Sequence, residues 1–181
     1  EEVRQWSPYT LISLDLNGVN ETSHWGDGLL DPALPFVDVL HCNLEEARIV
    51  TQLTQLSDES LQDYARRMSA KILLRGVACV LLTCGPDGAT LHVNHRDRLQ
   101  TASATLRNRC QNWSDAIEQL DSFPVAPGSV INANGAGDAA IAGLVAVLLT
   151  NDSSEVTLTP CIALKVALYS SLHTVDSALR A

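Results

Sequence analysis

The run Asn-Ala-Asn-Gly-Ala-Gly-Asp at residues 132–138 holds the residue types best suited to chemistry on a phosphate. Its two glycines allow a tight turn and a close approach of the backbone to a ligand. The small apolar residues that follow predict a helix that begins at Gly135. The first N–H groups of such a helix have no partner within it and, with the positive end of its dipole, form an anion site.

Asp138 places a carboxylate at the same helix start. The negative charge of a carboxylate repels a bound phosphate. Its presence here makes sense if it acts as the base for a hydroxyl that attacks the phosphorus. Such general-base assistance is worth roughly 10²–10⁴-fold in rate. The run therefore predicts a phosphoryl-transfer site, with Asp138 as the base and the backbone of Gly135, Ala136 and Gly137 around the transferring group.

Two other interpretations of this run are open. Residues 135–140 also fit G-x-G-x-x-A, the dinucleotide-binding fingerprint. That fold places the motif in its first strand-to-helix turn and an acidic residue about 20 positions later, at the end of a second strand. Glu155 lies near that distance but in a polar segment without a strand before it, which disfavours this interpretation. The simplest alternative is an Asn-Gly turn that only starts a buried helix.

Length and composition set further bounds. The chain has 181 residues, 46% of them hydrophobic, which is enough to bury the core of one domain. Its net charge of −9 argues against nucleic acid or an anionic membrane as a partner. Five cysteines without a C-x-x-C spacing favour reduced thiols and a cytoplasmic location, or an organelle reached after removal of a targeting segment. The longest apolar run, residues 139–149, is too short to span a bilayer.

The alternation of apolar runs and helix signals predicts an α/β layered fold, with a mainly parallel sheet flanked by helices. We expect strands at residues 10–14, 37–41, 77–83, 89–94 (antiparallel to the one before) and near Val130. We expect helices that begin at Asn43, at a cap in residues 57–59, at Gly135 and near residue 159. Residues 96–104 are expected to be extended, and residues 107–122 to form a loop or a short helix.

Two more groups of polar residues follow predicted strands. Asn43 and Glu46 have the spacing of a capping box, which needs no ligand. The carboxyl ends of strands are also where open α/β sheets bind ligands, and an amide with a carboxylate there suits the water shell of Mg²⁺. Thr83, Gly85 and Gly88 follow the next strand, although the Pro-Asp-Gly among them is an ordinary turn signal.

The histidines give no local signal for a metal or nucleophile site. His92 and His95 are three residues apart, and residues three apart on a strand point to opposite faces. His24, His41 and His173 are isolated, which is more typical of surface or satisfied core groups than of ligands. No Ser-His-Asp or Cys-His arrangement can be assembled from local sequence.

Four motifs, in the right order, resemble those of the ribokinase/PfkB carbohydrate kinase family. They are the family's D-x-N at residues 15–17, N-x-x-E at residues 43–46, T-x-G-x-x-G at residues 83–88 and G-A-G-D at residues 135–138. Three positions depart from the family pattern. Asn132 and Ala133 stand where the family has Asp and Thr, near the phosphates and a monovalent-cation loop, and Val19 stands where Arg is common.

The resemblance implies ATP-dependent phosphoryl transfer to a hydroxyl of a sugar or nucleoside, with Asp138 as the catalytic base. It implies ATP and Mg²⁺ as cofactors, and the family's cation loop adds a monovalent cation as a candidate. The residues that it assigns to Mg²⁺ are Asn43 and Glu46, and those that it assigns to the nucleotide site are Asn43, Glu46, Thr83, Gly85, Gly88 and Asn134.

The resemblance covers residues 10–177, and residues 1–181 correspond to the C-terminal, nucleotide-binding portion of a single PfkB-like kinase domain. The family's N-terminal portion carries further strands, the lid over the sugar and most substrate-recognition residues, none of which this sequence contains. An uncovered sheet edge is an aggregation hazard. We therefore expect the edge to be covered by that portion or by a second copy in a homodimer.

A second hypothesis is a non-catalytic PfkB-like subunit with a structural or regulatory role, based on Asn132, Ala133 and Val19. The acceptor stays open. Residues 170–175 and the G-A-G-D-A run look like pseudouridine kinases, whereas residues 15–17 with Trp25 look more like ketodeoxygluconate and fructose kinases.

Overall fold

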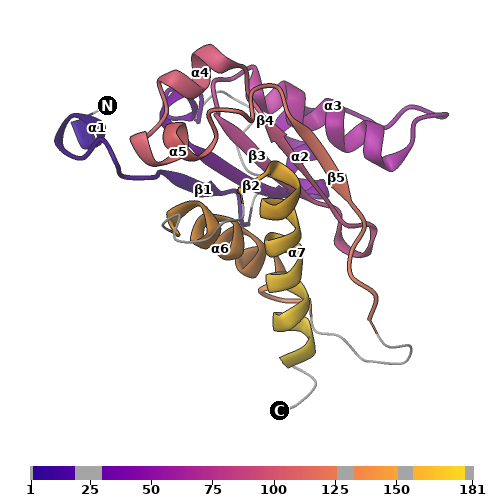
Figure 1. Cartoon of the computed structure of the whole chain (residues 1–181). Coiled ribbons are helices and arrows are strands. Elements are labelled where there is room, and N and C mark those ends of the chain that lie inside the picture. Colours follow the sequence, from indigo (N-terminus) through magenta and orange to yellow (C-terminus); the bar gives the residue numbers. More distant parts are fainter. Residues whose placement is uncertain (1, 19–29, 126–132, 151–156, 178–181) are drawn as a thin grey trace.

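A five-stranded sheet between two layers of helices forms the body of the protein (Figure 1). The structure, a computed structural model, describes residues 2–18, 30–125, 133–150 and 157–177. The strands are β1 Ser13–Asp15, β2 Val39–Asn43, β3 Cys79–Thr83, β4 Ala89–Val93 and β5 Ile117–Leu120. The helices are α1 Glu2–Trp6, α2 Leu44–Thr51, α3 Leu61–Leu73, α4 Arg96–Gln100, α5 Ala104–Arg109, α6 Ala136–Leu149 and α7 Pro160–Ser177, with 3₁₀ turns η2 Leu34–Phe36 and η3 Gly85–Asp87.

The sheet has a parallel half and an antiparallel half. The strands are ordered β1-β2-β3-β4-β5, as in the chain. β1, β2 and β3 are parallel, so their carboxyl ends meet at one edge of the sheet. Parallel neighbours need a crossover, which α2 and α3 provide between β2 and β3. β4 and β5 are each antiparallel to the strand before. The α/β layered fold predicted from the sequence is confirmed, with a mixed sheet.

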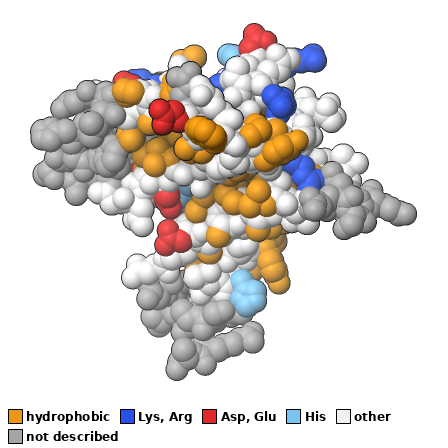
Figure 2. Space-filling view, turned by 90° about the vertical axis from the view of Figure 1, so that its left-hand side faces the viewer, with side chains coloured by type: hydrophobic (Ala, Val, Ile, Leu, Met, Phe, Trp, Pro, Cys, Tyr) orange, Lys and Arg blue, Asp and Glu red, His pale blue; other side chains and the backbone are white. Residues whose placement is uncertain are grey.

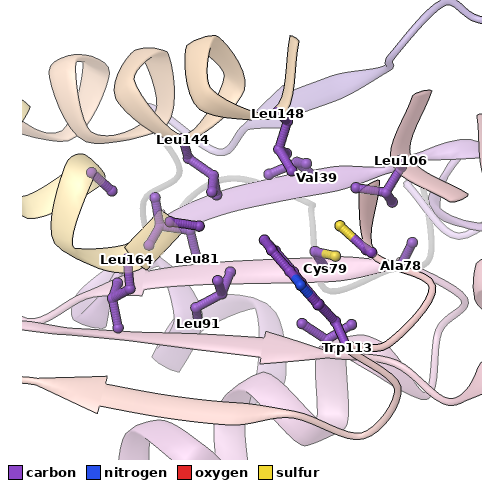
Figure 3. Close-up of a cluster of buried hydrophobic side chains, with 14 of the residues drawn as sticks. Val39, Ala78, Cys79, Leu81, Leu91, Leu106, Trp113, Leu144, Leu148 and Leu164 are labelled. Carbon is purple, nitrogen blue, oxygen red and sulfur yellow. The ribbon is translucent and has the colours of Figure 1, made fainter. Parts of the chain in front are cut away.

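Two hydrophobic clusters hold the helices on the sheet, because successive side chains of a strand point to opposite faces. Leu40, Val80 and Leu82 belong to the cluster shared with α2 and α3. The other cluster, on the opposite face, includes α6, α7 and the buried Trp113. Figure 3 shows the side chains of this second cluster, among them Val39, Cys79, Leu81, Leu91, Leu144, Leu148 and Leu164. β2 and β3 are buried on both faces and form the centre of the core.

Several local expectations were wrong. Residues 96–104 are not extended, because His95 and Ser103 accept the Arg98 and Leu106 N–H groups and start α4 and α5. Residues 107–122 contain β5, an edge strand whose exposed polar residues concealed its pairing with β4. The cap of α3 is Ser60, three positions after the start of the expected cap at residues 57–59. The strand expected near Val130 lies outside the described residues.

The face of the molecule beside β1 exposes apolar surface. Within the described residues, no strand pairs with the outer edge of β1. Figure 2 shows hydrophobic side chains gathered across this side of the molecule. α6 contains only one charged residue, Asp138, and the apolar Leu149 at its end is 54% exposed.

None of the described helices is long and apolar enough to cross a membrane. All five cysteines are free thiols.

Truncating a core leucine of α6 should be far more costly than truncating an exposed one. Leu144 is 1% exposed, so Leu144→Ala should lower the free energy of unfolding by about 2–5 kcal/mol through lost contacts and a cavity. Leu149→Ala makes the same change at an exposed position of the same helix and should cost no more than about 0.5 kcal/mol. Urea unfolding measures both, and equal losses would contradict the packing described here.

Candidate active site

A cavity of about 710 Å³ lies where the carboxyl ends of the parallel strands meet the start of α6. All residues that the sequence analysis singled out for the site line this cavity: Asn43, Glu46, Thr83, Gly85, Gly88, Asn134, Gly135, Ala136, Gly137 and Asp138. Asp15 and Asn17 of the D-x-N motif line it too. Four motifs that are far apart in the sequence therefore converge on one cavity.

The N-terminus of α6 is open toward this cavity. Gly135 is its N-cap, with a φ of 81° that favours glycine and no side chain to cap the helix. The Ala136 N–H donates to the Ala133 carbonyl, 3.1 Å away. Among the described residues, the N–H groups of Gly137 and Asp138 have no acceptor. They are unsatisfied donors at the positive end of a 14-residue helix, which is the arrangement that binds anions.

The start of α2, in contrast, is closed by its own side chains. The Asn43 N–H donates to Glu46 Oε2 at 2.8 Å, and the Glu46 N–H donates to Asn43 Oδ1 at 2.9 Å. The capping box expected from the sequence is therefore present. It uses one carboxylate oxygen of Glu46, Oε2, and does not involve Oε1. The structural and functional interpretations of this pair are thus compatible.

A hydrogen-bonded line of side chains crosses the three parallel strands. His41 Nδ1 is 2.9 Å from Asp15 Oδ1, and His41 Nε2 is 3.3 Å from Thr83 Oγ1. His41 is only 3% exposed. His41 is isolated in the sequence, so its place in the site was not predicted. The available signal was its position in β2, two residues before Asn43, which puts both side chains on the same face of the sheet.

The hydrogen bond from His41 lowers the pKa of the Asp15 carboxyl. Burial raises this pKa, and the charge of His41, the Asn17 N–H and a hydrogen bond with Asp138 add smaller lowering effects. The carboxyl groups of Asp15 and Asp138 both line the cavity.

The lining of the cavity combines acidic and apolar side chains. Three carboxylates line it, those of Asp15, Glu46 and Asp138, and no Lys or Arg is among the described lining residues. Its apolar wall was not predicted from the sequence and is built by Phe123, Pro124, Val125, Leu168, Leu172 and Val175. Phe123 is held edge-on against Tyr169 of α7, with ring centroids 6.1 Å apart. Such a wall suits a flat, apolar group, and the carboxylates suit a cation with its anionic ligand.

No group of three or more His, Cys, Asp and Glu side chains in the described parts is placed to hold a metal ion. Mg²⁺ does not need such a cluster, because it keeps several waters and uses one or two carboxylates plus substrate phosphates. Asn43 and Glu46 fit that requirement, because both line the cavity and the capping box uses only one carboxylate oxygen of Glu46.

Comparison with known proteins identifies the fold. No protein-family model matches the chain, and no curated protein matches its sequence. The solved structures similar to it include an adenosine kinase from Anopheles gambiae in complex with P1,P4-di(adenosine-5) tetraphosphate, at 20% identity and a TM-score of 0.61. The chain has the ribokinase-like fold.

Two further structures show the same likeness. One is ribokinase from Arabidopsis thaliana complexed with ribose and ATP, at 22% identity and a TM-score of 0.58. The other is a PfkB protein from Polaromonas sp. JS666, at 17% identity and a TM-score of 0.57. The three alignments cover 99%, 92% and 92% of this chain, but only 46%, 42% and 42% of those chains. The chain thus spans less than half the length of these kinases, and at such identities the likeness establishes the fold alone.

Removing the His41 ring should raise the pKa of the Asp15 carboxyl toward its ordinary value of about 3.9. In the wild type the folded state favours the carboxylate, so Asp15 stabilises the fold above about pH 4 and loses this effect as the pH falls further. Carboxyl ¹³C NMR of the wild type and His41→Ala measures the shift directly. An unchanged pKa of Asp15 in the variant would contradict the hydrogen bond.

Proposed function

We propose that this chain is the nucleotide-binding and catalytic portion of an ATP-dependent kinase that phosphorylates a hydroxyl of a sugar or nucleoside. The observation that carries the proposal is Asp138, a carboxylate at an open helix N-terminus inside the cavity. The helix start attracts a phosphate, and the carboxylate has a use there only if a proton must be removed. In this proposal residues 1–181 are the C-terminal portion of a single kinase domain.

The transfer step follows from these groups. Asp138 accepts the proton of the acceptor hydroxyl as its oxygen forms a bond to the γ-phosphorus of ATP. The bond from that phosphorus to the bridging oxygen of ADP breaks, and ADP leaves with the electron pair. The N–H groups of Gly137 and Asp138 stabilise the negative charge on the transferring phosphoryl oxygens. The phosphorylated acceptor and ADP are the products.

Asn43 and Glu46 would organise Mg²⁺, through the Glu46 carboxylate oxygen that the capping box leaves free. When bound, Mg²⁺ neutralises charge on the β- and γ-phosphates. A tetra-anionic nucleotide would otherwise face three carboxylates with no Lys or Arg among the described lining residues. A monovalent cation near Asn132 and Ala133 is part of the same proposal, and Asn132 lies outside the described residues.

The nucleotide would lie in this cavity. Thr83, Gly85, Gly88 and Asn134 line it and would contact the phosphates and ribose. The apolar wall that contains Phe123 and Leu172 would receive the adenine base. The likeness to structures named as adenosine kinase and ribokinase supports a nucleoside or a sugar as the acceptor.

The open edge of β1 and the apolar surface beside it would be covered by the N-terminal portion of the kinase or by a second copy of the chain in a homodimer. The net charge of −9 supports a small-molecule acceptor rather than nucleic acid or an anionic membrane. We further propose a cytoplasmic location, which the five free thiols support.

Asp138→Asn should lower turnover by roughly 10²–10⁴-fold, because the amide accepts no proton from the acceptor. Its affinity for ATP should stay near that of the wild type, since the backbone donors of α6 are unchanged. Calorimetry with Mg²⁺ and ATP measures the affinity, and a sugar and nucleoside panel with the longest available form of the protein measures turnover.

Asp97→Asn is the matched control, because Asp97 occupies the first turn of α4, outside the cavity lining. An Asp138→Asn variant that turns over like this control would remove Asp138 from the role of base. A wild type that binds ATP tightly but phosphorylates nothing would favour the alternative of a non-catalytic subunit.

Nucleotide binding should depend on a divalent cation. Excess EDTA should abolish the ATP signal in calorimetry, because the three carboxylates that line the cavity repel the free nucleotide. Glu46→Gln keeps an oxygen for the Asn43 N–H, so the cap of α2 stays while the charge is lost. This variant should weaken Mg²⁺-dependent ATP binding roughly 10–100-fold.

Glu45→Gln is the control for Glu46→Gln, because Glu45 lies in the same helical turn but is exposed and paired with Arg48. It should leave Mg²⁺-dependent binding unchanged. Equal affinities of the two variants, or ATP binding that survives EDTA, would show that Glu46 does not organise Mg²⁺.

A further inference from the structure

His41 contacts three parts of the proposed site at once. Its ring bonds Asp15 at the end of β1 and Thr83 at the end of β3, and it lies against the backbone of Gly137 in the first turn of α6. Asp15 and Asp138 lie on the side where the acceptor would be deprotonated, and Thr83 lies on the side of the nucleotide. His41 therefore lies between the two halves of the reaction.

The two hydrogen bonds fix the orientation of the ring. The Asp15 carboxylate can only accept, so Nδ1–H donates to it, and Nε2 bonds the Thr83 hydroxyl on the opposite side. The side chain is 4% exposed. A buried polar ring is costly unless its nitrogens are bonded, and an apolar side chain would fill the same space more cheaply. The choice of histidine is explained by the two bonds.

The ring also limits how the start of α6 can approach the sheet. A Cβ at position 137 would lie 2.9 Å from His41 Cε1, closer than such atoms approach in real structures. The backbone of Gly137 thus rests directly on the edge of the imidazole. Because the Gly137 N–H and the Asp138 side chain belong to this turn, the ring sets their distance from Thr83 and Asp15.

We propose that His41 is a positioning residue for phosphoryl transfer. Its ring, held by Asp15 and Thr83, acts as a spacer that places the anion-binding turn of α6 over the ends of β1 and β3. The proposal rests on the kinase function proposed above and deepens it. His41 acts through Gly137, Thr83 and Asp15 and needs no contact of its own with the substrate.

Two near-isosteric variants separate the two hydrogen bonds of the His41 ring, one to Asp15 and one to Thr83. The amide nitrogen of Asn occupies the place of Nδ1, so His41→Asn keeps the bond to Asp15 and loses that to Thr83. The amide of Gln reaches the place of Nε2, so His41→Gln keeps the bond to Thr83 and loses that to Asp15. We expect His41→Asn mainly to raise the KM for ATP, and His41→Gln mainly to lower kcat. Each change should be roughly tenfold, as expected for contacting groups.

A double-mutant cycle tests the contact with α6. Gly137→Ala should lower turnover and stability, because its methyl group collides with the ring. In the double variant with His41→Asn, the smaller side chain makes room for the methyl group, so turnover should recover roughly tenfold relative to Gly137→Ala alone. Urea unfolding of the wild type, the two single variants and the double variant measures the same contact as a change in stability, independently of any activity. Gly143→Ala, on the same helix but against Ser170 of α7, is the control and should show no recovery with His41→Asn.

The outcomes distinguish this inference from the proposed function. Additive losses in both turnover and stability, or equal kinetic changes in His41→Asn and His41→Gln, would overturn the positioning role while leaving the kinase intact. A wild type that neither binds ATP nor phosphorylates any acceptor would overturn the kinase and the positioning role together, even if the stability cycle shows the contact. Recovery in the double variant together with the split between KM and kcat would support the proposal.

Discussion

The unsatisfied start of α6 is the constraint on which the site depends. Gly135 takes a left-handed conformation and provides no side-chain cap, so the next N–H groups face the cavity without an acceptor among the described residues. The neighbouring helix α2 shows the opposite solution, because Asn43 and Glu46 satisfy its first donors from within. Two helix starts therefore meet the same cavity, and each carries a carboxylate: the start of α2 is closed by its own side chains, whereas the start of α6 has no side-chain cap.

The rest of the fold keeps these two helix starts at one edge of the sheet. β1, β2 and β3 are parallel, and their register places Asp15 beside His41 and Asn43 beside Thr83 at this edge. Alternation along β2 sends Leu40 into the cluster with α3 and directs Val39 and His41 to the opposite face, under α6. The same strand thus builds the core and delivers a polar side chain to the site. Buried strands give that side chain a rigid support.

The charge of the cavity follows from the same arrangement. Three carboxylates line the cavity, and the described lining contributes no Lys or Arg to balance them. In the proposed kinase, backbone donors of α6 and a bound cation are the groups that would hold phosphates there. Apolar side chains complete the lining, and among them Phe123 packs edge-on against Tyr169.

The sequence by itself determined the layered α/β class, the capping box of α2, the start of α6 and the residues of the four motifs, because each depends on neighbours within a few positions. The caps of α4 and α5, His95 and Ser103, are local too but were not recognised in the sequence, whereas β5 depends on its pairing with β4. Nor did the sequence reveal the apolar wall or the hydrogen bonds of His41. The partners of His41 lie 26 and 42 residues away in the chain, and only the parallel packing of three strands brings them within hydrogen-bond distance.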